Sequence, residues 1–336
     1  MKIAIDAMGG DKAPAVVVEG ARDALRSHSS IKRMFLVGAS DQLAACCRQA
    51  GLTDPRVEIV EAPELIGMSE PGAKAIRRKK LSSISIATEL VKSGDADAVV
   101  SAGNTGAMVA AATLKLRLLE GVERAGIASP LPNEFGTCNI LDAGANPEAK
   151  PRHLVQYALM GTAFARHVLR VEAPTVGLMS NGEEDDKGTT FTKETHALLR
   201  ATPGINFIGN VEGHDLFETK LDVVLCDGFT GNVVLKSCEA TAKAVAKWLK
   251  IELTRSPLRT LGAAMSRGAF AAIKKRSSYE SYGGSPLLGV RGVVIIAHGS
   301  SSALAIRNAI RVACESVSHR VNPHIEEALR GLGNPL

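Results

Sequence analysis

Aromatic residues are scarce in this chain, at 4% with a single Trp, so it lacks the stacking platforms of single-stranded nucleic-acid binders. The six cysteines form no CxxC pair and have no matched histidine spacing, which argues against a zinc site or a disulfide framework. No apolar run reaches the roughly eighteen residues of a spanning helix. Met1 leads directly into an apolar strand pattern instead of a basic and apolar leader. We therefore expect a cytoplasmic protein with no metal, no cofactor and no nucleic-acid partner.

The chain has enough apolar residues for a large core. It has 336 residues, 45% of them hydrophobic, and a formal net charge of +5, which favours anionic substrates or acidic partners. Short apolar runs alternate with segments of helical periodicity, as in α/β proteins. We predict one α/β catalytic domain over residues 1–336, with a Rossmann-like, mostly parallel sheet in αβα layers.

One strand, loop and helix unit organises the prediction. Residues 222–226 form an apolar run that suits a strand buried on both faces, residues 227–232 are glycine-rich, and a helical pattern opens at Val233. A loop between a strand and a helix amino end favours an anion. Cys226 raises the question of a nucleophile, but its apolar surroundings favour the core. The candidate site residues of this loop are Asp227, Gly228, Thr230, Gly231 and Asn232.

A second unit repeats the first. Residues 98–100 predict a strand and residues 107–119 a helix, and the loop between them shares a Gly-x-Thr-Gly skeleton with residues 228–231. Ordinary glycine turns are the alternative for each loop taken alone. The candidates in this second loop are Ser101, Gly103, Asn104, Thr105 and Gly106.

Further polar residues follow other predicted strands, where open α/β sheets build their sites. Asp6 and Asp11 flank a glycine loop, either as helix caps or as groups that orient a substrate. Lys187 stands in an acidic loop before a helix, either as a solvated ion-pair partner or aimed at an anion. His298 ends the strand predicted over 293–297 and is either structural or part of the site. Beyond Asp6, Lys187 and His298, the candidates at strand ends are Gly9, Gly10, Asp142 and Asn146.

Two segments suggest contacts with partners. The basic run Arg77, Arg78, Lys79 and Lys80 is either a solvated face or a docking patch for an acidic partner. Two helical stretches joined at Pro257 predict a projecting helical hairpin at about 233–280. Its apolar and basic mixture suits a dimer interface or a membrane surface, with packing on the parent domain as the alternative.

Several strings, in order along the whole chain, resemble the bacterial phosphate acyltransferase (PlsX) family. The only departure concerns Met179, Ser180 and Asn181, where a Leu-Asn pair followed by an aliphatic residue would be expected, which leaves the local role of Ser180 and Asn181 open. The matching strings are IDAMGGD (5–11), SAGNTGA (101–107), LDAGAN (141–146), GEEDDKG (182–188), DGFTGNVVLK (227–236) and LLGVRGVVIIAHGSS (287–301).

The resemblance implies a reaction and partners. A fatty acyl group would move from the thioester of acyl carrier protein to inorganic phosphate, giving acyl phosphate for phospholipid synthesis. It also implies a homodimer, a fold like that of phosphate acetyltransferases and the isocitrate dehydrogenase group, and peripheral membrane association. A downstream glycerol-3-phosphate acyltransferase that uses acyl phosphate is a further candidate partner.

Phosphate is itself a nucleophile, so this reaction needs no covalent enzyme intermediate. We expect Lys187, Asn104, Thr105, Thr230 and backbone N–H groups to bind phosphate. Asn232 and His298 would then contact the carbonyl oxygen or protonate the departing thiolate, with Asp227 or Asp6 orienting them.

Two other functions are alternatives to acyl transfer. A nicotinamide-dependent dehydrogenase shares the fold class, but no G-x-G-x-x-G follows the first strand, and no P-loop motif occurs for phosphotransfer. A non-catalytic scaffold that binds carrier protein or membrane is the other, and the polar loops at the strand ends argue against it.

Overall fold

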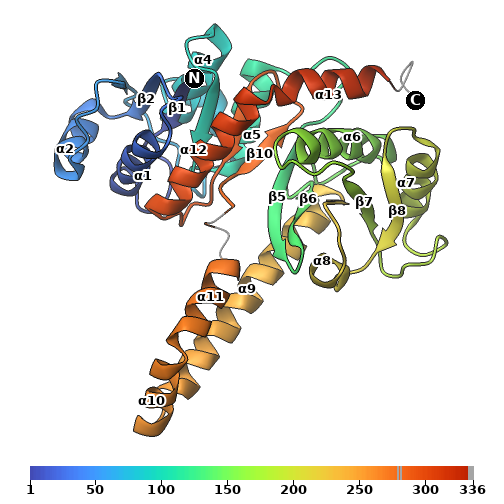
Figure 1. The fold of residues 1–336 in the computed structure, drawn as a ribbon. Coiled ribbons are helices and arrows are strands. Elements are labelled where there is room, and N and C mark those ends of the chain that lie inside the picture. Colours follow the sequence, from blue (N-terminus) through green and yellow to red (C-terminus); the bar gives the residue numbers. More distant parts are fainter. Residues whose placement is uncertain (278–279, 281, 332–336) are drawn as a thin grey trace.

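The computed structural model describes residues 1–277, 280 and 282–331, and one eleven-stranded sheet runs through both halves of the molecule (Figure 1). The strand order is β3-β2-β1-β4-β11-β10-β5-β6-β9-β7-β8. In each half, helices cover both faces of the sheet. This arrangement confirms the predicted α/β class with a mostly parallel sheet. The assignment of residues 1–336 to one domain stays a prediction.

The first half contains a parallel block of five strands. Apart from the edge strand Val57–Glu61, which has no buried residue, they are mostly apolar and buried because helices lie on both faces. One face packs against α1 (Ala15–Ser27), α2 (Ser40–Ala50) and α12 (Ala303–Ser318), the other against α3 (Gly72–Arg78), α4 (Ser83–Ser93) and α5 (Thr105–Ala111), which continues as a π-helical turn, Ala112–Leu116. The strands are β1 (Lys2–Asp6), β2 (Arg33–Gly38), β3 (Val57–Glu61), β4 (Ala98–Ser101) and β11 (Val293–Ile296).

The second half contains a parallel block of four strands. One face carries α6 (Pro151–His167), α7 (Thr190–Ala201) and α13 (Val321–Arg330), while α8 (Asp215–Glu218) and the start of α9 lie on the other. The strands are β6 (Gly136–Leu141), β9 (Val223–Leu225), β7 (Thr175–Met179) and β8 (Asn206–Val211).

Two antiparallel strands join the halves. The strand β10 (Ser285–Leu288) pairs with β11 on one side and with β5 (Gly126–Asn133) on the other, and β5 pairs with β6. Sequence analysis did not anticipate these strands, because Pro130, Pro132 and Pro286 interrupt the apolar pattern that identifies a strand.

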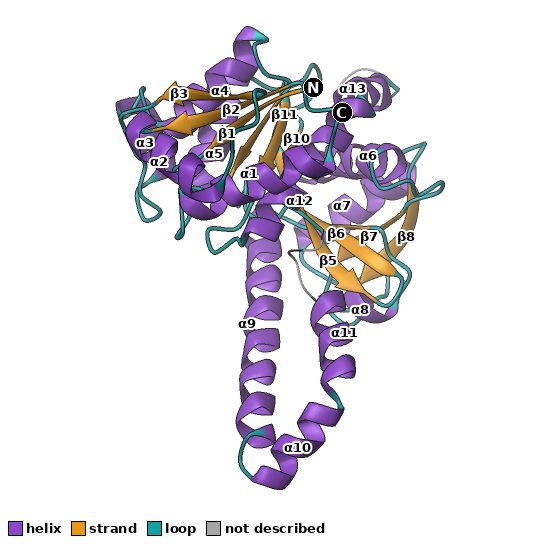
Figure 2. Ribbon diagram, turned by 60° about the vertical axis from the view of Figure 1, so that its left-hand side comes forward, coloured by secondary structure: helices purple, strands orange, loops and turns teal. Residues whose placement is uncertain are grey.

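The predicted helical hairpin is present and projects from the sheet (Figure 2). It consists of α9 (Gly228–Leu253), α10 (Pro257–Met265) and α11 (Arg267–Ser277). The second arm was predicted as one helix, but it is divided at Ser266. Residues 278–279 of the predicted hairpin lie outside the described residues. Within the described part of the chain, no helix has the length and hydropathy required to cross a bilayer.

The start of α9 corrects a second prediction. The helix was expected from Val233, after a loop, yet it begins at Gly228 with Asp227 as its N-cap. The Asp227 side chain accepts the amide N–H groups of Phe229 and Thr230, which outweighs the low helix propensity of Gly228 and Gly231.

Candidate functional site

A cleft of about 360 Å³ lies where the two halves meet, beside the first turns of α9. The amino end of α5, the loop after β6, the loop after β11 and the start of β10 supply its walls. Helix amino ends and loops at strand ends therefore meet there, as expected for an open α/β sheet. The predicted site residues that line the cleft are Thr105, Gly106, Gly228, Asn232 and His298.

The amino end of α5 offers unused donors to this cleft. Asn104 caps the helix by accepting the Ala107 N–H at 2.9 Å. Among the described residues, nothing accepts the amide N–H groups of Thr105 or Gly106, and both residues are exposed where the cleft opens. Free N–H groups and the positive end of the helix dipole favour an oxyanion there.

Asn104 is engaged in structure instead of facing the cleft. Its side-chain amide lies 3.1, 3.0 and 2.8 Å from the carbonyl oxygens of Gly67, Met68 and Glu70. With its side-chain oxygen on Ala107, both ends of the amide are used. Asn104 therefore fixes the loop before α3 against α5, and a phosphate contact would have to displace these bonds.

The amino end of α9 has no comparable free donors. Gly228 N–H donates to Asn146 at 3.0 Å, the next two amides donate to the Asp227 carboxylate, and Gly231 N–H donates to the Asp227 carbonyl. The Thr230 hydroxyl donates to Asp227 as well, at 2.6 Å. The backbone N–H groups of residues 228–231 are therefore all used within the protein and are not available to bind an anion.

The two glycines of this turn serve close packing. A Cβ at Gly231 would collide with the carbonyl oxygen of Asp142, and one at Gly228 would lie 2.8 Å from the Asp142 carboxylate. They let the first turn of α9 lie directly on the loop after β6. This contact fixes the direction in which α9 presents Asn232.

Asn232 is the α9 residue of the predicted set that faces the cleft with its side chain. It is exposed, and its side chain makes no hydrogen bond to another described residue. An amide in this position can donate to a carbonyl or phosphate oxygen without first breaking a bond.

Lys236 and Glu239 also line the cleft, and sequence analysis missed both. They lie four and seven residues after Asn232, on one face of a helix. Lys236 Nζ is 3.2 Å from Glu239 Oε2 and 3.3 Å from Nε2 of His298. The available signal was this spacing, since residues four and seven positions after Asn232 lie along the same side of a helix.

His298 has a defined orientation. Its Nδ1 accepts the backbone N–H of Ser300 at 3.1 Å and lies 2.8 Å from the Ser300 hydroxyl. That contact assigns the proton of the neutral ring to Nε2, which points toward Lys236 and Glu239. Because an ammonium only donates, the approach of Lys236 to Nε2 is a contact of charge with the ring and not a hydrogen bond in this tautomer. Burial and then the positive charge of Lys236 lower the pKa of His298. The ring is therefore a neutral N–H donor at physiological pH.

The loop after β6 is held by a buried carboxylate. Asp142 accepts four backbone N–H groups, from Ile127, Gly144 and Ala145 at Oδ1 and from Asn146 at Oδ2. Burial raises the pKa of Asp142, and these hydrogen bonds oppose the rise. Asp142 and Asn146 thus shape the cleft wall at Gly144 and do not line the cleft themselves.

Asp6 plays a similar part in the first half. It is 1% exposed and accepts the Ser101 hydroxyl at 2.6 Å, and Ser101 in turn accepts the Gly103 N–H. Burial raises the pKa of Asp6, while the hydrogen bond from Ser101 opposes it. A Cβ at Gly9 would collide with the Asp6 carboxylate, so Gly9 is needed for packing.

Gly10 supports the neighbouring loop. It has φ +110° and lies against the carbonyl of Gly299, and Asp11 N–H donates to that carbonyl at 2.8 Å. Contacts therefore connect the loops after β1, β4 and β11. The predicted residues Asp6, Gly9 and Gly10 support the cleft wall and do not line the cleft.

Lys187 does not line the cleft. It lies in the loop between β7 and α7, half exposed, and its ammonium is 4.0 Å from Glu184 Oε1. Because β7 pairs in parallel with β9, this loop shares a sheet edge with Asp227.

The basic run lies at the end of α3. Arg77, Arg78 and Lys80 are exposed, whereas Lys79 pairs with Glu70 at 2.6 Å. Three of the four cations are thus available at the surface beside the loop that Asn104 holds.

Cys226 is a core residue, as its surroundings predicted. It is 4% exposed, and burial raises its pKa well above the ordinary value for a thiol. It is therefore not an activated nucleophile.

One cluster of acidic and histidine side chains has the spacing of metal ligands. Glu183, His214 and Asp215 bring possible ligand atoms within 4.8 Å of one another, outside the cleft lining. The Asp215 carboxylate already accepts the Glu212 N–H and the Thr219 hydroxyl, so its oxygens are used in the protein itself.

Comparison with known proteins shows relatives that match nearly the whole length of this chain. The family model described as "Fatty acid synthesis protein" matches residues 1–324. A protein of Akkermansia muciniphila named phosphate acyltransferase is 61% identical over 99% of this chain and 97% of its own. One of Pelotomaculum thermopropionicum with the same name is 48% identical, covering 99% of this chain and 96% of its own.

Solved structures share the fold at low sequence identity. A phosphotransacetylase of Streptococcus pyogenes matches with a TM-score of 0.60 at 16% identity, covering 95% of this chain and 94% of its own. A branched-chain phosphotransacylase of Enterococcus faecalis matches with a TM-score of 0.57 at 13% identity, covering 94% and 99%. These likenesses confirm the group of folds that the motifs implied.

Proposed function

The chain belongs to the phosphate acyltransferase family that its motifs predicted, and from this we propose that it moves a fatty acyl group onto inorganic phosphate. The acyl donor is the thioester of acyl carrier protein, and the product is an acyl phosphate for phospholipid synthesis. One observation carries the proposal. The free amides of Thr105 and Gly106 share a cleft with the Lys236 ammonium and the N–H of His298.

The cleft has what this reaction requires. The two amides of α5 and the Lys236 ammonium bind hydrogen phosphate and hold one oxygen toward the thioester carbon. Neutral His298, through Nε2–H, and the Asn232 amide donate to the carbonyl oxygen as it becomes an oxyanion. Both groups are in place before substrate arrives.

The step balances without an enzyme nucleophile. A phosphate oxygen bonds to the carbonyl carbon, the oxyanion collapses, and the carbon–sulfur bond breaks. The hydrogen-phosphate proton becomes acidic in the acyl phosphate and ends on the departing sulfur. We assign His298 to the oxyanion instead of the thiolate, because Nδ1 is held by Ser300 and the neutral ring has no free acceptor for a relay.

Lys187 stays part of the proposal as a second cation for phosphate. Its contact with Glu184 is long and exposed, so little is lost when the side chain turns away. Its loop lies at the sheet edge that also carries Asn232. Asp227 orients Asn232 by capping α9, and Asp6 orients the α5 loop through Ser101.

The carrier protein is acidic by the same hypothesis, and we assign part of its docking surface to Arg77, Arg78 and Lys80. They are exposed and lie one short helix away from the loop before α3 that Asn104 ties to α5. Exposed charges of this kind speed encounter more than they tighten binding.

The hairpin carries two proposed contacts. On the stem, Val245, Trp248 and Leu249 are 51%, 63% and 43% exposed, and they form an apolar face for a second copy of the chain in a homodimer. At the tip, Leu258 and Met265 are 80% and 83% exposed and face a lipid surface. Membrane contact would bring acyl phosphate to a downstream glycerol-3-phosphate acyltransferase.

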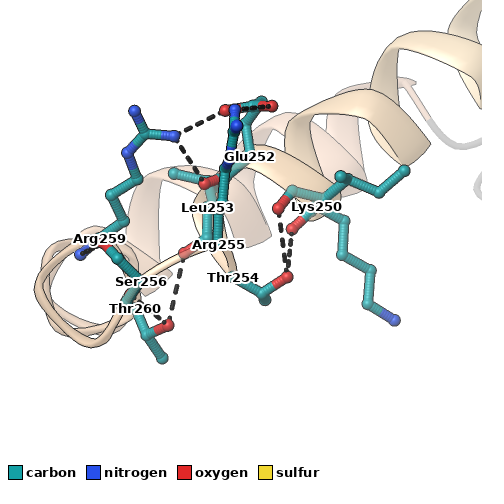
Figure 3. Close-up of polar contacts among 9 residues, drawn as sticks. Lys250, Glu252, Leu253, Thr254, Arg255, Ser256, Arg259 and Thr260 are labelled. Atoms are coloured by element: carbon teal, nitrogen blue, oxygen red, sulfur yellow. Dashed lines mark hydrogen bonds and ion pairs between the residues drawn. The ribbon is translucent and has the colours of Figure 1, made fainter.

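Hydrogen bonds and ion pairs stabilise the turn at the tip of the hairpin (Figure 3). Ser256 caps α10 through the Arg259 N–H, and Pro257 occupies its first turn. Glu252 accepts Arg259 at 2.6 Å and Arg255 at 3.4 Å. Because the turn is fixed from within, its apolar side chains stay outward with two arginines beside them.

The function is tested by one assay. Purified protein is mixed with palmitoyl-acyl carrier protein and phosphate, and acyl phosphate is trapped with hydroxylamine as the hydroxamate. We expect product that depends on phosphate and on the protein, and released thiol in equal amount. Thiol release without hydroxamate would mean hydrolysis, and neither product would refute the proposal.

A further inference from the structure

A second hollow, of about 180 Å³, lies on the opposite face of the sheet from the cleft. It occupies the junction of the two halves, between the end of α6 and the side of α12. Its walls are largely apolar, from Pro130, Phe164, Val168, Leu169, Pro286 and Val312.

The charged groups at this hollow are paired with each other. Arg311 Nη1 lies 2.9 and 2.8 Å from the two carboxylate oxygens of Glu315, and Nη2 donates to the Tyr282 carbonyl at 3.3 Å. Asn139 donates its side-chain amide to the backbone carbonyl of Asp222 at 3.3 Å. Because these groups already have partners, the surface left for a ligand is mainly apolar.

The hollow and the cleft lie back to back across strands β5 and β10. Side chains alternate along a strand, so Ile127, Ser129 and Ser285 face the cleft, while Pro286 faces the hollow. Pro130 and Gly284 line both spaces. The wall between the two spaces at this point is the sheet itself.

The ladder of backbone pairs between β10 and β5 ends at that point. The strands β10 and β5 pair through Leu287 with Ile127 and Leu288 with Gly126. Continued by the same register, Ser285 stands opposite Ser129, and there the strands are joined by their hydroxyls, 2.9 Å apart. The next pair is Gly284 and Pro130, and Pro130 has no N–H to extend the ladder.

We propose that the acyl chain of the substrate passes between Gly284 and Pro130 and lies in this hollow, which sets the chain length accepted. The inference rests on the proposed function, because it takes the thioester carbonyl to be held in the cleft. The carbonyl end stays with Asn232 and His298, and the distal methylenes contact Phe164, Val168 and Leu169.

Two variants fill the hollow from opposite walls. Leu169→Trp extends a side chain that is 37% exposed, and Thr137→Trp does so from β6, at a position that is also not fully buried. Neither residue belongs to the reacting site. The control is Arg166→Trp, which places the same ring on the exposed side of α6, outside the hollow.

The variants are assayed with butanoyl, octanoyl, dodecanoyl and palmitoyl thioesters of carrier protein. Each methylene excluded from an apolar site lowers kcat/KM about fourfold. We expect Leu169→Trp and Thr137→Trp to lower kcat/KM for palmitoyl thioester by about tenfold or more and for butanoyl thioester by less than about twofold. Arg166→Trp should leave the whole series unchanged.

Equal losses at every chain length, or no loss at any, would overturn the inference while leaving the proposed function standing. A binding measurement separates the two if the parent makes no acyl phosphate. Fluorescence of cis-parinaric acid, an 18-carbon probe, is titrated with parent and variants. We expect saturable binding to the parent and the control that Leu169→Trp weakens about tenfold; no binding to the parent, or equal binding to all, would refute the hollow as an acyl site.

Discussion

The Lys236 ammonium lies 3.3 Å from Nε2 of His298, although 62 residues separate them along the chain. The first turns of α9 bring Lys236 to the end of β11, next to His298. The other ring nitrogen of His298, Nδ1, accepts the Ser300 N–H. A cation beside a half-buried imidazole disfavours protonation and so keeps the ring neutral. The predictions below begin with this pair.

Replacing Lys236 should raise the pKa of His298. Burial is the larger cause of the lowered pKa and remains, but Lys236→Met removes the positive charge that disfavours a protonated ring. The resonance of His298 in an NMR titration should therefore move to a higher midpoint, and the acid limb of kcat/KM should move the same way. Lys247→Met, further along α9, is the control and should leave both in place.

Asn232→Ala should lower kcat by about 100-fold, the usual loss for one oxyanion donor. The side chain is exposed and makes no hydrogen bond to another described residue, so the melting temperature should stay within about 2 °C of the parent. Steady-state kinetics and a thermal melt measure the two effects. Full activity in a folded variant would remove Asn232 from the site.

Lys187→Ala should raise the KM for phosphate by about tenfold, since it removes one of two proposed cations without touching the acyl subsite. The matched control is Lys193→Ala, an exposed lysine on α7 just beyond the same loop. Kinetics with phosphate varied at saturating acyl donor make the comparison. Equal behaviour of the two variants would assign Lys187 to the solvated surface.

Reversing Arg77 and Arg78 to Glu should raise the half-saturating concentration of acyl carrier protein by about tenfold and flatten its salt dependence. Lys79 is left unchanged because it pairs with Glu70. Lys32→Glu with Arg48→Glu, two exposed cations elsewhere in the first half, is the matched control. If both double variants respond alike, net charge and not this surface explains the effect.

Leu261→Glu should lower binding to anionic vesicles by about tenfold or more, because it places a carboxylate among the apolar side chains of the hairpin tip. Leu261 is 61% exposed and makes little contact with the protein, so folding should be unaffected. Vesicle flotation with parent protein alongside gives the measurement. Flotation indifferent to the change would count against membrane contact at the tip.

The sequence alone determined the fold class, several of the strand, loop and helix units, and the family. These depend on local apolar periodicity and on short ordered strings, both of which are readable without contacts. It also placed Thr105, Asn232 and His298 at strand ends, where such sheets gather their sites.

Tertiary structure decided which of the two similar glycine segments keeps free amides. Both were interpreted as anion loops, but Asp227 and the Asn146 carbonyl use the donors of α9, while those of α5 stay open. It also brought Lys236 to His298 and placed Gly284 and Pro130 where the pairing of β10 with β5 ends. Each of these depends on which distant backbone group lies within hydrogen-bonding reach, and that is fixed only when the two halves of the sheet are joined.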